Sequence, residues 1–150
     1  MTDERDYVEN NDRQRERLRA LVKRLDDAAL SAPVNEYWTV AGVLGHMAYW
    51  DSRFLTLAEK IDRGEPWVQG DQEPDGDWLN DSTRPIILAI APRAAAELAL
   101  RMAEETDARA ATLPLNRLWP DDPDSPISPA RGEHRGEHLD EIDATLRYRG

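Results

Sequence analysis

Two histidines late in the sequence are spaced for metal chemistry. His134 and His138 lie four residues apart in the tandem stretch RGEHRGEH, so in a helix their imidazoles share one face, one turn apart. Two ring nitrogens placed in this way reach a single ion at the ~2.0–2.1 Å that zinc prefers. The alternative is a pair of surface or hydrogen-bonded histidines on an amphipathic helix. The spacing favours a divalent metal site.

The helix face that carries this pair combines packing residues with charge. Its sector includes Ile127, Ile142, Thr145 and Leu146, and three charged residues lie in it or beside it: Arg131, Arg135 and Glu141. Each buried charge costs several kcal/mol unless it is paired. Gly132 and Gly136 each cost about 1 kcal/mol relative to alanine inside a helix. Such losses are usually offset by a close approach between backbones or by a site.

Two other motif matches in the sequence are misleading. Residues 134–138 also fit the H-x-x-E-H pattern of inverted zinc peptidases, which need a further downstream carboxylate ligand in a far larger fold. We therefore interpret Glu137 as a solvent-facing residue or as a partner of a metal ligand. Residues 71–76, DQEPDG, resemble the opening of a calcium loop, but Ser82 stands where that loop needs a bidentate glutamate. We expect a solvated acidic turn there.

Hydrophobic periodicity predicts helices in the first half of the chain. Apolar residues at i, i+3, i+4 and i+7 indicate a first helix from about residue 6 or 11 to about residue 29. Thr39 is the expected N-cap of the second, because its hydroxyl can accept a hydrogen bond from an unpaired amide of the first turn. Gly64 supplies the stop of that helix, with Pro66 just beyond it.

The second half of the chain also predicts helices. A polar loop over 65–81 precedes a helical stretch over 81–112, which Pro92 kinks or divides. The proline-rich segment 113–127 is expected to be an extended, anchored loop. Ser128 is the expected N-cap of a last helix that begins with Pro129 and runs to about residue 148. No segment alternates with period two, so the fold class is all-α: an antiparallel four-helix bundle in a single domain over 1–150.

Composition excludes several classes of function. The 150 residues include 19 basic and 30 acidic side chains, for a net charge of −11, which argues against a nucleic-acid surface. The absence of cysteine excludes disulfides and thiolate ligands. No apolar run approaches the ~20 residues that a membrane span needs. The polar N-terminal stretch has no signal-peptide core, so we expect a cytoplasmic protein.

A third histidine lies in the second predicted helix. His46 sits at the margin of its apolar sector, one turn before Trp50. The segment over 38–51, WTVAGVLGHMAYWD, resembles the signature of the DinB/YfiT-like superfamily, in which a Trp-Ser/Thr-hydrophobic stretch leads to a histidine and then to an aromatic residue. The His-x-x-x-His of the last helix reproduces the second half of that signature. Asp77-Trp-Leu-Asn80 is a weaker match to a further family pattern.

The resemblance implies a four-helix bundle, often a homodimer, with a metal held by His46, His134 and His138. Characterised relatives include bacillithiol and mycothiol S-transferases and a mycothiol-dependent maleylpyruvate isomerase, and other relatives are proposed hydrolases or protect cells against toxic small molecules. The chain departs from the isomerase pattern, in which a glutamate replaces one histidine of the last helix. It also lacks an obvious basic site for a large anionic thiol, although Arg131 and Arg135 could contribute to one.

Such a site would supply an activated nucleophile. Three neutral imidazoles add no charge to a divalent ion and leave it at least one open coordination position. Water or a thiol bound at that position has a lowered pKa. Zinc, nickel and ferrous iron suit all-nitrogen ligation about equally. Hydrogen-bonding partners that fix the imidazole tautomers are expected among three acids: Asp51, Glu137 and Glu141. The candidate substrate pocket comprises Trp50, Trp78, Trp119, Arg131 and Arg135, with core packing as the alternative for each aromatic residue.

Three functions remain open from the sequence. The first is a metal-dependent enzyme that acts on a small molecule by thiol S-transfer or hydrolysis. A low-molecular-weight thiol is one candidate substrate. The second is a metal-containing binding or stress-response protein without turnover. The third is a purely structural bundle in which the histidines bond to carboxylates.

Overall fold

The computed structural model describes residues 5–65, 75–122, 125 and 127–149. These residues form six α-helices and one 3₁₀ turn, in the order α1 (Tyr7–Arg24), α2 (Asp27–Leu30), α3 (Val40–Asp62), α4 (Asp75–Leu88), α5 (Pro92–Ala110), η1 (Leu115–Arg117) and α6 (Arg131–Arg149). Their only β pairing is an isolated bridge between Pro33 and Thr39. The all-α prediction is confirmed. None of the described helices is long and apolar enough to cross a membrane.

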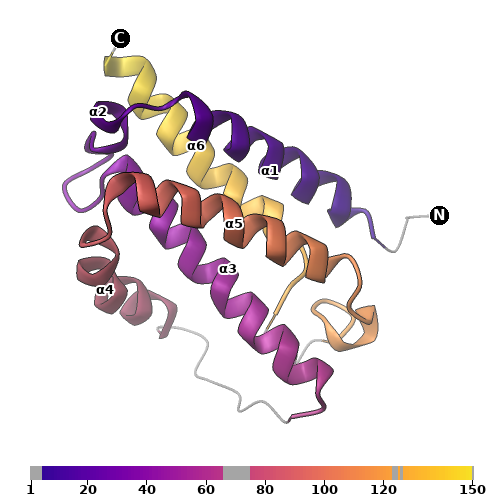
Figure 1. Cartoon of the computed structure of the whole chain (residues 1–150). Coiled ribbons are helices and arrows are strands. Elements are labelled where there is room, and N and C mark those ends of the chain that lie inside the picture. Colours follow the sequence, from indigo (N-terminus) through magenta and orange to yellow (C-terminus); the bar gives the residue numbers. More distant parts are fainter. Residues whose placement is uncertain (1–4, 66–74, 123–124, 126, 150) are drawn as a thin grey trace.

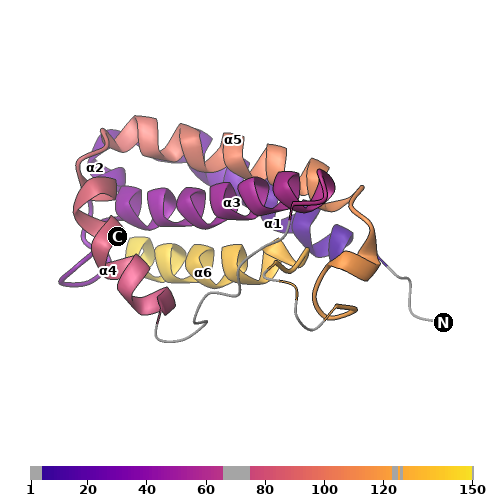
Figure 2. The same ribbon diagram turned by 90° about the horizontal axis from the view of Figure 1, so that it is seen from below.

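Four long helices make the bundle. α3 packs chiefly against α5, and α1 packs chiefly against α6. Following the chain colours in Figure 1, α1 and α6 run in one direction and α3 and α5 run in the other. The bundle is thus parallel within each pair and antiparallel between the pairs. Figure 2 shows α4 outside this bundle and beneath α3, the helix it packs against.

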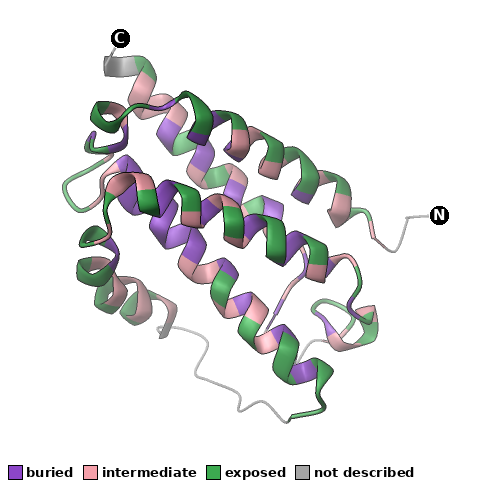
Figure 3. Cartoon of the chain, in the orientation of Figure 1, coloured by how far each residue is buried: buried purple, intermediate pink, exposed green. Residues whose placement is uncertain are grey.

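The interior consists of two apolar clusters. The larger one joins α1, α3, α5 and α6, and Leu18, Leu44, Ala96 and Ile142 are among its fully buried members. The smaller one lies at the C-terminal ends of α3 and α5, where Phe54 and Ile61 meet Leu118 and Ile127 of the connecting segment. Figure 3 shows the buried residues facing inward along all four long helices. The loop predicted over 113–127 is anchored by its own apolar side chains.

Three element boundaries differ from the sequence prediction. The first helix ends at Arg24, because Leu25 is extended and Asp26 starts a separate turn by accepting a hydrogen bond from Ala29 N. α4 begins at Asp75, inside the loop predicted over 65–81. α6 begins at Arg131 and not at Pro129. The expected N-cap, Ser128, instead accepts a hydrogen bond from Ala130 N in a local turn.

Other boundary signals act as expected. Thr39 caps α3 by accepting a 3.0 Å hydrogen bond from Gly42 N, and Gly64 follows the end of that helix with a φ of +77°. Pro92 is the first residue of α5, so it divides the predicted stretch over 81–112. The acidic turn expected over 71–76 and the Pro66 stop signal lie largely outside the described residues.

Candidate metal centre

Three imidazoles from two helices converge between α3 and α6. His46 comes from α3, and His134 and His138 come from α6. One ring nitrogen from each lies within 4.8 Å of the other two, and the Nε2 atoms of His134 and His138 are 3.0 Å apart. Nitrogens bound to one ion at ~2.0–2.1 Å are about 3 Å apart in tetrahedral or octahedral geometry. The described side chains therefore have the donor set of a three-histidine metal site, and the pair on α6 already has the spacing of two ligands on one ion.

His46 is enclosed by aromatic rings. Its side chain is buried, with 8% of the residue exposed, and ring centroids lie 5.4 Å away at Trp38 and 6.5 Å away at Trp50. Nδ1 of His46 is buried without a hydrogen-bond partner. Leaving such an atom unpaired costs about 1–3 kcal/mol, and bound ions or waters commonly account for orphaned polar atoms. The residues present therefore fit a bound metal.

His138 has an acidic partner. Glu141 Oε1 lies 2.6 Å from its Nδ1. With Nδ1 protonated and donating to the carboxylate, the lone pair of Nε2 points to the other two histidines. A carboxylate on the outer nitrogen of a ligating histidine fixes its tautomer and raises its basicity. Of the three acids expected to support the histidines, Glu141 is the one that contacts an imidazole among the described residues.

Two of the imidazoles are held in their neutral form. Burial, and then the neighbouring His138, lowers the pKa of His46 to about 4. Burial is also the largest cause that lowers the pKa of His134 to about 3, followed by the other two histidines and by Arg131 and Arg135. Metal ligation requires the neutral imidazole. At neutral pH neither of these two side chains needs to lose a proton before binding.

A buried ion network lies next to the histidines. It consists of Asp51 of α3, Asp107 of α5, Arg15 of α1, and Arg131 and Arg135 of α6. Asp51 accepts hydrogen bonds from Arg131 Nε at 3.0 Å and from Arg135 Nη2 at 3.2 Å. Arg135 also pairs with both oxygens of Asp107, at 2.9 and 3.1 Å, and Arg15 pairs with Asp107 at 2.9 Å.

The network explains why a buried face tolerates charge. The Arg135 side chain is only 2% exposed, and an unpaired buried cation costs several kcal/mol. Two carboxylates and the backbone oxygen of Asn11 surround its guanidinium group. Both arginines of the predicted pocket are therefore paired with acids of the bundle interior.

A family model described as the DinB superfamily matches residues 10–141. The chain belongs to the DinB superfamily. The matched span contains all three histidines and the buried ion network. Comparison with curated proteins and with solved structures found no match.

In this DinB chain, α1 fixes the start of the helix that carries two of the histidines. The buried Asn11 side chain accepts a 2.7 Å hydrogen bond from Gly132 N and donates a 2.8 Å hydrogen bond to Pro129 O. A β-carbon added at Gly132 would lie 2.8 Å from the backbone oxygen of Asn10. Gly132 thus permits the close backbone approach that the sequence suggested.

The remaining predicted residues of the DinB site are spread more widely. Trp50 donates a 2.9 Å hydrogen bond to Asn80 of α4 and faces His46. Trp78 and Trp119 are 68% and 52% exposed, and among the described residues the indoles beside His46 are those of Trp38 and Trp50. Glu137 is exposed on α6. Asp51 bonds to the two arginines and not to an imidazole.

Sequence reasoning missed several residues around the centre. Trp38 stands inside the family motif but was not assigned to the site, although its ring contacts His46. No nearby sequence pattern marks Asn11, Arg15 or Asp107 as part of the centre, because their hydrogen-bond partners lie far away in the chain.

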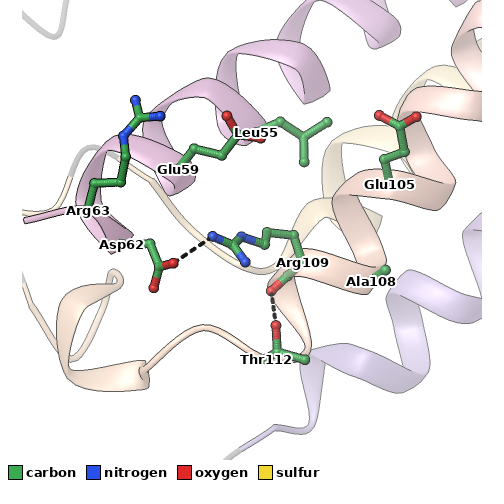
Figure 4. Close-up of a pocket in the computed structure, with 8 residues that line it drawn as sticks. All are labelled: Leu55, Glu59, Asp62, Arg63, Glu105, Ala108, Arg109 and Thr112. Atoms are coloured by element: carbon green, nitrogen blue, oxygen red, sulfur yellow. Dashed lines mark hydrogen bonds and ion pairs between the residues drawn. The ribbon is translucent and has the colours of Figure 1, made fainter.

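Two surface grooves lie apart from the three histidines. The larger, about 690 Å³, is lined by residues near the C-terminal ends of α3 and α5: Leu55, Glu59, Asp62, Arg63, Glu105, Ala108, Arg109 and Thr112. Figure 4 shows the Asp62–Arg109 ion pair that crosses it. The smaller, about 370 Å³, lies between α1 and α5 and reaches Arg15 and Asp107. Neither groove includes a residue predicted for the DinB site.

Proposed function

We propose that this protein is a metal-dependent enzyme that acts on a small molecule by thiol S-transfer or by hydrolysis. The convergence of His46, His134 and His138 carries the proposal. DinB membership over residues 10–141 supports it. A divalent ion held by three neutral imidazoles supplies Lewis-acid chemistry that lowers the pKa of a coordinated water or thiol.

The chain's own residues have separate roles in this proposal. Glu141 holds the proton of His138 at Nδ1, which leaves the lone pair of Nε2 to bind the metal. Trp38 and Trp50 shield His46 from water on either side. Burial chiefly lowers the pKa of His134, and the neighbouring histidines and the positive charge of Arg131 lower it further. All-nitrogen donors suit zinc, nickel and ferrous iron, so the proposal extends to each.

Metal analysis of protein purified without a polyhistidine tag tests the first part. We expect about one equivalent of zinc or nickel after loading and dialysis. His138→Ala removes the outermost ligand and is the matched control, which should retain far less metal. Binding below about a tenth of an equivalent by the wild-type protein would refute the metal site and favour a structural bundle.

A substrate screen tests the second part. Metal-loaded protein is assayed with low-molecular-weight thiols plus electrophiles, and with panels of esters and amides. We expect turnover in one panel that disappears in the His138→Ala variant. Metal binding without turnover in any panel would favour the alternative, a metal-containing binding or protective protein. Sedimentation velocity of the same samples tests the expected homodimer.

A further inference from the structure

We propose that Asp51 is a positioning residue for the metal centre, holding α3 against α6 so that His46 meets the other two histidines. This inference rests on the proposed metal site. It assigns to Asp51 a role other than contact with an imidazole, because its carboxylate bonds only to arginines among the described residues.

The geometry of the carboxylate carries the proposal. Asp51 follows His46 by five residues on α3, and its side chain is 6% exposed. Its two oxygens bind different residues of α6: Oδ1 accepts from Arg131 Nε at 3.0 Å, and Oδ2 accepts from Arg135 Nη2 at 3.2 Å. These arginines stand three residues before and one residue after His134. One buried carboxylate on the helix of His46 therefore holds α6 on both sides of His134.

Charge gives Asp51 a second effect on the same site. Two guanidinium groups lie near His134, and their positive charge opposes a divalent cation between the histidines. In the interior such repulsion is screened less than at the surface. The Asp51 carboxylate bonds to both guanidinium groups and offsets part of their charge. Its removal would alter both the helix spacing and the local charge.

Asp107 provides a matched comparison. It is equally buried, and it also pairs with Arg135. However, Asp107 belongs to α5, which carries none of the three histidines, and its second arginine is Arg15 of α1. Asp51→Asn and Asp107→Asn remove the same charge from the same network. Only the first substitution releases the helix of His46 from the helix of the other two.

The experiment compares zinc affinity with stability in these two variants. Zinc dissociation constants are measured by chelator competition, coordination by the visible spectrum of the cobalt-loaded protein, and metal-free stability by urea unfolding. We expect Asp51→Asn to weaken zinc binding by about 10–100-fold and to change the cobalt spectrum. Asp107→Asn should weaken it by less than about 3-fold at a comparable loss of stability. A purely structural role predicts equal losses in both variants and would overturn the proposal.

A second variant guards against misfolding of Asp51→Asn. Arg131 lies at the edge of the network with 16% of its side chain exposed, so Arg131→Gln removes one of the two bonds to Asp51 with less disturbance. We expect a smaller loss of zinc affinity than in Asp51→Asn, because one bond to Asp51 remains and because removal of one guanidinium group also relieves its repulsion of the cation, with helical content unchanged. Wild-type zinc affinity in both Asp51→Asn and Arg131→Gln would overturn the positioning role of Asp51 and leave the proposed metal site standing. A wild-type protein that binds no zinc refutes the proposed function, and this inference with it.

Discussion

The three imidazoles of the centre differ in their surroundings, and these differences set what each one contributes. His46 is buried next to two indoles and has an unpaired nitrogen. Burial disfavours the protonation of His134, and the neighbouring imidazoles and two guanidinium groups add to this effect. His138 lies at the edge, where Glu141 holds its outer nitrogen. Two neutral imidazoles with an outer, carboxylate-supported partner are well suited to binding a cation.

The Glu141 carboxylate predicts a specific loss of affinity. Glu141→Gln keeps the shape of the side chain but removes the carboxylate charge that holds the outer nitrogen of His138. We expect zinc affinity to fall by about 10–100-fold, with little change in metal-free stability because Glu141 is exposed. Chelator competition measures this. Glu137→Gln, on the same helix and also exposed, is the control and should bind zinc as the wild type does.

The depressed pKa values of two histidines predict how metal-free stability depends on pH. In the unfolded chain an imidazole binds a proton near pH 6.5, whereas in the folded protein His46 does so at about 4 and His134 at about 3. Below pH 6.5 the unfolded state therefore binds more protons, and stability falls as the pH falls. Each imidazole contributes a slope of at most about 1.4 kcal/mol per pH unit.

Urea unfolding in the presence of a chelator, between pH 7.5 and 5, measures this slope. The range stays above the ordinary pKa values of the carboxylates. We expect His46→Gln to have a shallower dependence than the wild type, and both curves to be flat above pH 7. Parallel curves across the whole range would contradict the prediction.

At the level of the elements, local signals predicted the helices but not every boundary. Apolar periodicity, the Thr39 cap and the Pro92 break lie within a few residues of what they control, so the sequence displays them. The start of α6 could not be predicted in this way. Its first turn is capped by Asn11, which lies 121 residues before Gly132 in the chain. The better local cap, Ser128, instead forms a turn of its own.

The two glycines of α6 make contrasting predictions. A β-carbon at Gly132 would meet the backbone of Asn10 at 2.8 Å, so Gly132→Ala must push α6 away from α1. At Gly136 the nearest atoms, at 3.1–3.3 Å, belong to the movable Gln14 side chain. We expect Gly132→Ala to destabilise the protein by about 1–3 kcal/mol. Gly136→Ala should stay within about 1 kcal/mol, because the helix propensity of alanine offsets the contact.

Urea unfolding of the metal-free variants measures both effects. The two substitutions are chemically identical and lie one turn apart, which makes each the control of the other. A Gly132→Ala variant at least as stable as Gly136→Ala would show that α1 and α6 are not tightly packed there.

For the whole molecule, buried polar contacts join all four long helices around one arginine. Arg135 of α6 bonds to Asn11 O of α1, Asp51 of α3 and Asp107 of α5. The sequence indicated a charged residue on a buried face but could not identify its partners, which lie 28 to 124 residues away in the chain. For the same reason, spacing alone paired His134 with His138, and only the family motif brought in His46.

A metal at this centre would join α3 to α6 and so stabilise the whole bundle. Because an unfolded chain offers no preformed site, free metal at 100 times its dissociation constant should stabilise the folded state by about 2.7 kcal/mol. For a chain of 150 residues this raises Tm by about 5–11 °C. Differential scanning calorimetry with and without zinc measures the shift. His138→Ala should unfold near the wild-type Tm without metal, because its side chain lies at the edge of the bundle, and should gain little when zinc is added. An equal gain in this variant would mean that the stabilising ion binds elsewhere.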